Sequence, residues 1–345
     1  MTRCVAVNTA FEAVWPEVPD RLVEYWRGTG DVQCVRLDPE DDRPVSAVLD
    51  APADVEQLVA LGVPVTDDCV AALSNLDEAT VMDGGYSPDT EAHAALEAAG
   101  VTTHFHESEG FWSQSVAELA LGITIGAMRR IPSKHQAITE GTDVWDRDLW
   151  DERAEAGYGG VQVTADSPFW THGTVDGKRL RAVGVGNIGS RYLDYMHGLG
   201  ADVAAYDPYA DEPCFHRAGA RQVHHLEDLL DDAEIFAPLV PLTAETEGLV
   251  DRDLVEALPE GCLVVLVTRA GVTDFETVRE RVLDDEIALA ADVFDYEPLE
   301  PDDPIVGRDN VVHTPHVAGR TEDANAAWAR MLLARFSGSG VDGPE

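Results

Sequence analysis

The chain has 345 residues, with 65 acidic and 24 basic side chains and a formal charge of −41 at pH 7. Its hydrophobic content of 45% is ordinary for a globular protein, which excludes an acidic disordered chain. A surface this acidic argues against binding to nucleic acids or anionic membranes, since phosphate contacts need a basic face. At roughly 150 residues per domain, the length predicts two domains.

The charge also indicates where the protein works. Only Lys134 and Lys178 are lysines, and every other basic residue is an arginine. A net charge this large strains a compact state by self-repulsion, but at about 1 M salt the Debye length falls to about 3 Å. The composition therefore favours the multi-molar salt of an extreme halophile's cytoplasm, and the scarcity of lysine resembles haloarchaeal proteins.

The five cysteines stand at scattered positions and form no C-x-x-C pair. This spacing predicts reduced thiols and supports neither a metal site nor a redox motif. The N-terminal residues lack the apolar core of a signal peptide, and no stretch of about 18 apolar residues predicts a transmembrane helix. These features agree with a cytoplasmic protein.

In chain order, short apolar runs alternate with acidic, helix-like segments. The runs cover residues 4–8, 45–50, 180–186, 202–207, 234–240, 262–267 and 288–294. Continuous apolar strands that alternate with helices indicate a parallel sheet covered on both faces. We therefore expect an α/β protein whose parallel sheets are doubly wound rather than closed into a barrel.

Three further segments depart from this rhythm. Residues 113–131 predict the clearest helix, capped by Ser113 or Ser115 and buried because it is apolar almost all round. Residues 140–176 carry five aromatic side chains with little periodicity. We expect a long excursion there, in which the aromatic side chains anchor packing rather than contact a substrate. The tail after Phe336 is expected to be disordered.

A G-x-G-x-x-G motif lies at Gly184, Gly186 and Gly189, between a predicted strand and a predicted helix. About 20 residues further on, a second strand ends at Asp207, and this βαβ context disfavours a chance glycine-rich turn. The glycines permit a tight turn, a close approach of backbone to pyrophosphate, and close helix packing, while the helix N-terminus binds the anion. Asp207 would accept both ribose hydroxyls and repel a 2′-phosphate, so NAD is preferred over NADP.

Polar residues follow three of the later apolar strands. Arg269 stands in TRAG, Glu297 in DVFDYEP and His316 in TPHVAG. Ligands of open α/β sheets bind at the carboxyl ends of strands, so we expect these side chains to converge near a nicotinamide. Arginine pairs with a carboxylate, histidine moves a proton and a carboxylate orients the histidine, as 2-hydroxyacid chemistry needs. Taken singly, each residue has an ordinary explanation that serves as well or better. Arg269 would be part of a surface ion pair, Glu297 a solvating acid and His316 a core histidine.

The chain resembles the D-isomer-specific 2-hydroxyacid dehydrogenase family in motifs that follow family order. They are SVAELALG (115–122), VGVGNIG (183–189), AYDP (205–208), PLTAETEGLV (241–250), TRAG (268–271), DVFDYEP (292–298) and TPHVAG (314–319). The resemblance implies that Arg269, Glu297 and His316 are catalytic. It also implies cofactor contacts from the glycine loop and from Asn187, Ile188, Asp207, Pro241, Thr268 and Asp292, of which Asp292 would hold the nicotinamide amide.

The family fold implies two Rossmann-like domains, the substrate domain being discontinuous. Residues 1–112 and 318–345 would form that domain, and residues 113–317 the NAD-binding domain, with a long insertion around 146–172. Gly84, Gly85 and Tyr86 stand where the family binds the substrate carboxylate with backbone N–H groups, and an ordinary tight turn is the alternative explanation.

Two positions depart from the family pattern. Trp112 stands where members often carry Asn, and narrowing of the pocket and packing of the hinge are the two roles open to it. Leu239 replaces a common His, which we expect to be tolerated.

The leading hypothesis is an NAD-dependent D-2-hydroxyacid dehydrogenase that acts on a small 2-keto acid. A phosphoglycerate enzyme should gather cations, but the first 110 residues hold five Arg and no Lys. This favours a glyoxylate or hydroxypyruvate type and leaves 3-phosphoglycerate open. The alternative is a catalytically weak NAD(H)-sensing protein of the same fold, against which the intact catalytic set argues. Formate dehydrogenase is disfavoured, because that branch typically has Gln at the position of Glu297. The family implies a homodimer and closure of the domains around the site.

Overall fold

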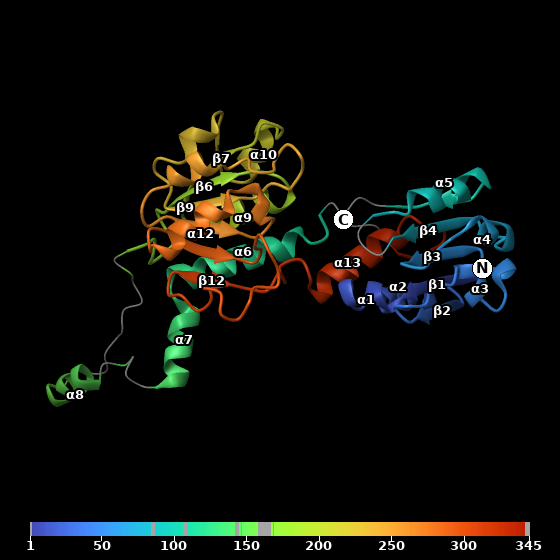
Figure 1. Cartoon of the computed structure of the whole chain (residues 1–345), viewed down its shortest axis with the longest axis horizontal. Helices are drawn as coiled ribbons and strands as arrows, with labels where there is room; N and C mark the ends of the chain where they lie inside the picture. The colour runs from blue at the N-terminus through green and yellow to red at the C-terminus, as the bar shows by residue number, and fades with distance from the viewer. Residues whose placement is uncertain are drawn as a thin grey trace. The chain divides into compact units, whose positions relative to one another are not determined.

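The computed structural model describes residues 2–83, 87–105, 110–141, 145, 147–157, 167 and 169–341. The chain forms two compact units (Figure 1). Unit 1 combines Met1–Phe111 with Arg320–Glu345, and unit 2 is Trp112–Gly319. Each unit is built around one all-parallel sheet, which confirms the predicted α/β class.

Unit 1 contains five parallel strands in the order β2-β1-β3-β4-β5. They are β1 (Arg3–Asn8), β2 (Val32–Leu37), β3 (Gln57–Leu61), β4 (Glu78–Met82) and β5 (Thr102–Thr103). The helices are α1 (Thr9–Val14), α2 (Val18–Arg27), α3 (Val45–Val48), α4 (Asp67–Ala72), α5 (Thr90–Ala98) and α13 (Glu322–Leu333). Every residue of β1 and β3 is buried, as expected of central strands that are covered on both faces.

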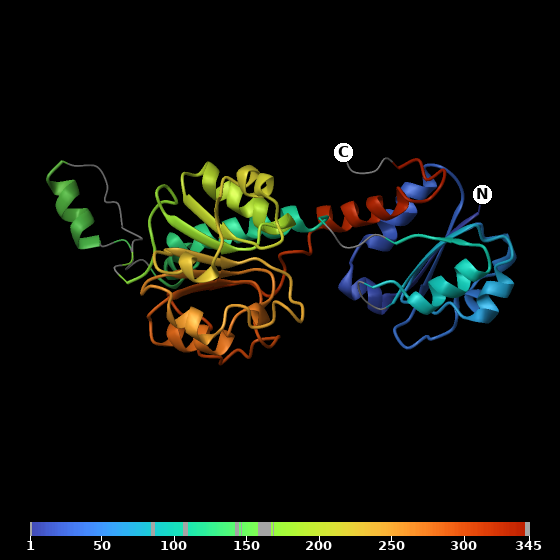
Figure 2. The same cartoon turned by 90° about the horizontal axis from the view of Figure 1, so that it is seen from above.

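The C-terminal segment completes unit 1, where α13 packs against α2 (Figure 2). Beyond α13, the Phe336 ring meets Trp26 edge-on, with ring centroids 5.3 Å apart. The Ser337 N–H donates to Glu78 Oε2 at 2.8 Å, and the buried Arg3 donates from Nη2 to the Gly338 carbonyl at 2.7 Å. The expectation of a disordered tail is therefore wrong for this part, because a buried guanidinium needs acceptors and the tail supplies one. Residues 342–345 lie outside the described residues.

Unit 2 contains seven parallel strands in the order β12-β11-β10-β9-β6-β7-β8. They are β6 (Arg179–Val183), β7 (Asp202–Tyr206), β8 (Arg221–Val223), β9 (Ile235–Pro238), β10 (Leu263–Leu266), β11 (Ala288–Ala291) and β12 (Val311–His313). The helices are α6 (Ser113–Met128), α7 (Ile131–Glu140), α8 (Arg147–Glu155), α9 (Asn187–Gly198), α10 (Glu212–Arg217), α11 (Arg252–Glu256) and α12 (Phe275–Leu283). In the described part of the chain, no helix is both long and apolar enough to span a membrane.

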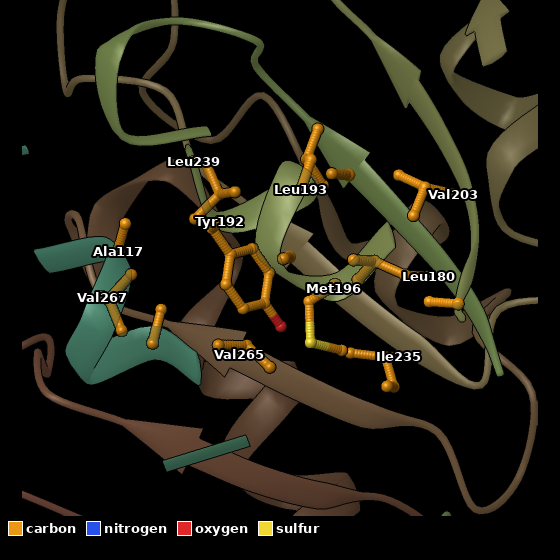
Figure 3. Packing of buried hydrophobic residues seen from close by; sticks show 14 of the residues in the cluster. Ala117, Leu180, Tyr192, Leu193, Met196, Val203, Ile235, Leu239, Val265 and Val267 are labelled. Carbon is orange, nitrogen blue, oxygen red and sulfur yellow. The ribbon is translucent and has the colours of Figure 1, made fainter. Parts of the chain in front are cut away.

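Two separate apolar cores cover the faces of the unit 2 sheet. One core joins α6 and α9 to strand residues such as Leu180 and Val265. The other joins α11 and α12 to strand residues such as Phe236 and Val264. Figure 3 shows the ring of Tyr192, on α9, among the apolar side chains of the first core. Tyr192 is fully buried, and its hydroxyl lies 3.0 Å from Thr124 Oγ1 on α6, so the two helices share one polar contact inside the core.

The long helix α6 has the predicted first residue, but its cap and its last residue differ from the prediction. It begins at Ser113 and ends at Met128 rather than Ile131, because Arg130 takes a left-handed conformation (φ 52°) that starts α7. Neither predicted serine caps the helix, whose N-cap is Trp112. Ser115 instead donates its hydroxyl to the Ala318 carbonyl, which draws the segment after β12 onto the helix.

The predicted excursion contains helix α8, and most of its aromatic side chains are not packing anchors. Trp145, Trp150 and Phe169 are 42%, 41% and 70% exposed, so that prediction is wrong for these three. Trp170 does pack against the first core of unit 2, whereas Tyr158 lies outside the described residues. The excursion therefore carries three exposed aromatic side chains among its described residues.

Candidate active site

The glycine motif forms the turn between β6 and α9, and two of its three glycines have no room for a side chain. Gly184 has φ 101°, and a Cβ there would lie 2.8 Å from Val240 Cγ1. A Cβ on Gly189 would lie 2.3 Å from the Gly184 carbonyl oxygen. A Cβ on Gly186 would meet no heavy atom within 4 Å, so the space over this glycine is open. The loop thus has the closed turn and the open backbone face that a pyrophosphate requires.

Helix α9 begins directly at this open face, with Asn187 and Ile188 in its first turn. Its N-cap is Gly186, and no side chain caps the helix. The first N–H groups of the helix are therefore left for an anion, and the helix dipole favours one there. Asn187 is exposed, whereas Ile188 is partly buried against the core, so Ile188 can offer the cofactor its backbone more readily than its side chain.

Asp207 directly follows the next strand, β7, and its carboxylate is already bound to backbone N–H groups. Oδ2 accepts the Val185 N–H of the glycine loop at 2.8 Å, and Oδ1 accepts the N–H groups of Tyr209 (2.9 Å) and Ala210 (3.1 Å). A carboxylate has about four acceptor positions, so this one fixes the loop and keeps capacity for a ribose hydroxyl. The residues present therefore fit a dinucleotide.

The predicted catalytic side chains follow three neighbouring strands. In the sheet order β12-β11-β10, His316 follows β12, Glu297 follows β11 and Arg269 follows β10. Pro241 follows β9 and the glycine loop follows β6, so the predicted catalytic and cofactor residues of unit 2 lie along one carboxyl edge of its sheet. Parallel strands bring these positions together although 80 or more residues separate the loop from each catalytic side chain.

His316 and Glu297 form a hydrogen-bonded pair. His316 Nδ1 lies 2.7 Å from Glu297 Oε2, and Glu297 Oε1 accepts the Phe294 N–H at 2.9 Å. The glutamate is thus oriented by the turn that carries it, and it fixes the imidazole through Nδ1, so that Nε2 is the ring nitrogen outside this hydrogen bond. His316 has φ 54°, a left-handed conformation that costs about 1–3 kcal/mol and persists only where the surroundings enforce it.

The turn that carries Glu297 is anchored by a neighbouring polar cluster. The Tyr296 hydroxyl donates to the buried carboxylate of Asp303, which also accepts Arg279 Nη2 at 2.6 Å. Burial alone would raise the pKa of Asp303, but the hydrogen bonds from Tyr296 and Arg279 outweigh it and hold that pKa below its usual range. An ionised Asp303 therefore ties this turn to helix α12.

Arg269 is exposed and stands where β10 meets a 3-10 turn. Its Nη1 donates to the Thr268 carbonyl at 2.7 Å, and Thr268 is buried with its hydroxyl on the Pro238 carbonyl at 3.2 Å. Within the described residues, no Asp or Glu forms an ion pair with Arg269. The surface ion pair that could have explained this arginine is therefore not seen there, and its guanidinium stays available for a substrate carboxylate.

Asp292 lies beneath this site and is fully buried. Its Oδ1 accepts the Thr314 hydroxyl at 2.5 Å and the Val317 N–H at 2.9 Å, and its Oδ2 accepts the Ala318 N–H at 2.8 Å. Hydrogen bonds to a charged group contribute roughly 1.5–3 kcal/mol each, which stabilises this buried carboxylate. Sequence reasoning missed Thr314 and Ser115 as parts of the site, although both lie in motifs that carried the resemblance.

The predicted substrate loop, Gly84, Gly85 and Tyr86, lies outside the described residues. The residues on either side of it are tied together, since the Asp83 N–H donates to the Ser87 carbonyl at 3.1 Å. Just before the loop, the Val81 N–H donates to His93 Nε2 on α5 at 3.0 Å. In the described residues, no group of three or more His, Cys, Asp or Glu side chains is arranged to hold a metal ion.

The chain is similar to known dehydrogenases along most of its length. The D-3-phosphoglycerate dehydrogenase of Methanocaldococcus jannaschii is 27% identical over 281 residues, covering 81% of this chain and 48% of the relative. The glyoxylate reductase of Korarchaeum cryptofilum is 26% identical over 297 residues, covering 85% and 82% of the two chains. The chain thus spans about half the length of the first of these relatives and most of the second.

The fold has close counterparts among solved structures. The apo form of D-mandelate dehydrogenase from Rhodotorula graminis superimposes with a TM-score of 0.66 at 20% identity, covering 97% of this chain and 94% of that one. The apo structure of D-lactate dehydrogenase from Escherichia coli gives a TM-score of 0.63 at 18% identity, covering 96% and 95%.

A family model supplies the assignment itself. The model described as "D-isomer specific 2-hydroxyacid dehydrogenase, NAD binding domain" matches residues 121–318, which include the glycine loop, the arginine and the histidine–glutamate pair. This match makes NAD the cofactor of unit 2. With more than half of the chain matched, the protein belongs to the D-isomer specific 2-hydroxyacid dehydrogenase family.

Proposed function

We propose that the protein is an NAD-dependent dehydrogenase that interconverts a small 2-keto acid and its D-2-hydroxy acid. The observation that carries the proposal is the His316–Glu297 pair at 2.7 Å, on the same sheet edge as an exposed arginine and a dinucleotide-type loop. A protein that only senses NAD(H) needs no proton-transferring pair beside its cofactor. The geometry thus favours an enzyme over the sensing alternative.

Each side chain has a defined role in this reaction. NADH, when bound, supplies the hydride for the carbonyl carbon. Arg269 pairs with the substrate carboxylate and polarises the carbonyl, as a planar guanidinium can. His316 gives a proton from Nε2 to the carbonyl oxygen, and Glu297 stabilises the protonated ring through Nδ1. In the oxidative direction the same histidine takes the proton back.

Cofactor choice follows from Asp207. Asp207 directly follows β7, and its carboxylate lies beside the glycine loop, where it would repel a 2′-phosphate. We therefore propose that NAD is used in preference to NADP. The roles of Asn187, Ile188, Pro241 and Thr268 as cofactor contacts, and of residues 84–86 as the carboxylate-binding loop, belong to the same proposal.

The substrate we favour is unphosphorylated, of the glyoxylate or hydroxypyruvate type. Four of the five arginines in the first 110 residues are engaged: Arg3 with Gln57, Arg21 with Glu24, Arg36 with Glu12 and Arg43 with Asp41. Arginines so paired are poor candidates to bind a substrate phosphate. The chain is similar both to a glyoxylate reductase and to D-3-phosphoglycerate dehydrogenases. Phosphohydroxypyruvate is therefore the substrate against which the unphosphorylated keto acids are compared.

The test is NADH oxidation at 340 nm in about 3 M KCl, where surface repulsion is screened. Glyoxylate, hydroxypyruvate, pyruvate, 2-ketoisocaproate and phosphohydroxypyruvate form the panel, with NADPH in parallel. Turnover with one keto acid is expected and names the substrate class. Binding of NADH without turnover on the whole panel would contradict the enzyme and support the sensor.

We also propose that the protein is a homodimer in a salt-rich cytoplasm. Helix α7 has no buried residue within the chain, and it presents Ile131 and Ile138 at 53% and 49% exposure. Exposed apolar side chains of this kind are typical of an interface. Light scattering on the eluting peak of a sizing column in molar KCl measures the mass directly, and a mass of one chain would contradict the proposal.

A further inference from the structure

We infer that Asp292 is a positioning residue, which holds His316 in place by tethering the backbone on both sides of it. The inference rests on the proposed function, since it assigns a task to a residue beneath the proton-transferring pair. The three donors that reach Asp292 come from Thr314, Val317 and Ala318, at 2.5, 2.9 and 2.8 Å. They lie before and after His316, so one carboxylate holds both ends of the segment that carries it.

The conformation of His316 shows why such a tether is needed. With φ 54°, this residue occupies a region that side-chain-bearing residues rarely adopt without outside support. In this turn the N–H groups of Val317 and Ala318 point to the same carboxylate. Further bonds fix the rest of the segment: the Thr314 N–H donates to the Ala291 carbonyl at 3.0 Å, and the Ser115 hydroxyl binds the Ala318 carbonyl.

The acceptor positions of Asp292 distinguish its tethering of the His316 segment from a contact with the cofactor. A carboxylate has about four acceptor positions, two on each oxygen. Oδ1 of Asp292 already has two donors, Thr314 and Val317, whereas Oδ2 has one, Ala318. A nicotinamide amide could therefore use only Oδ2. A change at Thr314 alters the tether through Oδ1 and leaves that remaining position untouched.

The chemistry of the side chain must be that of a carboxylate. All three groups around it are donors, so an ionised acid satisfies each of them. An amide at the same place would turn an NH2 group toward one of these donors and leave it unpaired in a fully buried position. The tether should therefore weaken in Asp292→Asn without any change of side-chain size.

The experiment compares Thr314→Val, Thr314→Ser and Asp292→Asn with the unchanged protein in about 3 M KCl. We expect Thr314→Val to lower kcat about tenfold and Asp292→Asn about a hundredfold, in the range of misplaced acid–base groups. Because Thr314→Val leaves Oδ2 untouched, the Kd for NADH and the KM for the keto acid should stay within about twofold in that variant. Thr314→Ser should restore kcat, because it restores the hydroxyl.

Thr277→Val is the matched control. Thr277 is a buried threonine on α12, and its hydroxyl has no hydrogen-bond partner in the described part of the chain. Its replacement removes the same atoms from a buried position without touching the segment around His316. It should leave kcat unchanged.

A second measurement does not depend on activity. Amide hydrogen exchange at Val317 and Ala318 should accelerate at least tenfold in Asp292→Asn, while exchange in β11 stays as it was. The inference fails if Thr314→Val keeps its full kcat, or if Asp292→Asn raises the Kd for NADH and leaves kcat at saturating NADH intact. The proposed function fails separately, if the unchanged protein reduces no keto acid.

Discussion

At the scale of single residues, the site depends on side chains that are fixed by backbone groups. Glu297 is oriented by the Phe294 N–H, Asp207 by three N–H groups and Asp292 by two N–H groups and a hydroxyl. Each of these acids is therefore placed before any ligand arrives. Such preorganisation is what lets a small change at one residue affect the chemistry strongly.

The histidine gives the first prediction. His316→Ala should lower kcat by about 10²–10⁴, the usual range for a lost general acid, with little effect on the Kd for NADH. Steady-state kinetics and NADH fluorescence measure the two quantities. His224→Ala, at an exposed position after β8, is the control and should keep full activity. An active His316→Ala variant would remove this residue from the mechanism.

The glycine loop gives the second prediction, because two of its positions have opposite surroundings. Gly189→Ala would place its methyl group 2.3 Å from the Gly184 carbonyl oxygen, so Tm should fall markedly. Gly186→Ala meets no protein atom within 4 Å, so Tm should hold while the Kd for NADH rises at least tenfold, because the methyl group occupies the pyrophosphate space. Thermal melting with and without NADH tests both, and a Gly186→Ala variant that binds NADH normally would rule out this placement of the pyrophosphate.

At the scale of elements, the boundary between β4 and α5 carries a pH dependence. His93 Nε2 accepts the Val81 N–H, which only the neutral ring can do. Burial lowers the pKa of His93 from 6.5; Glu97 and Asp89 oppose this shift, and His104 adds to it. Since the folded pKa lies below the unfolded one, this contribution to stability is intact above about pH 6.5 and is lost as the pH falls toward the folded pKa.

The third prediction follows from the lowered pKa of His93. The protection of residues 80–83 against amide exchange, measured relative to the intrinsic exchange rate at each pH, should fall between pH 7.5 and pH 5.5. His93→Gln should remove most of this fall, because an amide oxygen still accepts the bond without titrating. Exchange in β12 is followed separately, because burial also lowers the pKa of His313. Equal acid sensitivity in His93→Gln would assign the effect to another group.

The elements also show what the sequence could and could not predict. Alternating apolar strands and the glycine spacing predict the parallel sheet and its carboxyl edge, because both are local patterns repeated along the chain. Docking of Ser337 on Glu78 leaves no such pattern, since it is one contact between a backbone group and a distant side chain. The same holds for Asp292, whose motif was recognised but whose partners could not be read from it. The exposure of Trp145 and Trp150 was missed because aromatic side chains usually indicate a core.

At the scale of the whole molecule, charge dominates. The chain carries a formal charge of −41, and many of its arginines are engaged in ion pairs, such as the buried Arg181 between Asp202 and Asp232. The hydrogen bond from Arg181 holds the pKa of Asp232 below its usual range, so that acid remains negative under mildly acidic conditions. The excess of unpaired acids must then be screened by the solvent.

The fourth prediction is that stability rises with salt. Tm should increase steeply between about 0.1 M and 2 M KCl, because the Debye length shrinks from about 10 Å to less than 3 Å. Sucrose, which stabilises compact states without screening charge, is the control and should raise Tm less. A Tm that falls as KCl is added would show that repulsion does not limit this fold.

The discontinuity of unit 1 has a consequence for the order in which the newly made chain can fold. Residues 112–319 form a continuous unit and can fold as soon as they have left the ribosome. Residues 1–111 emerge earlier but must wait, because α13 and Phe336, which cover α2 and Trp26, are made after residues 112–319. During synthesis the first segment therefore carries an uncovered apolar face for the longest time, although it is the oldest part of the chain. Unit 2, which the NAD-binding family model matches, should therefore be complete while unit 1 still lacks α13 and Phe336.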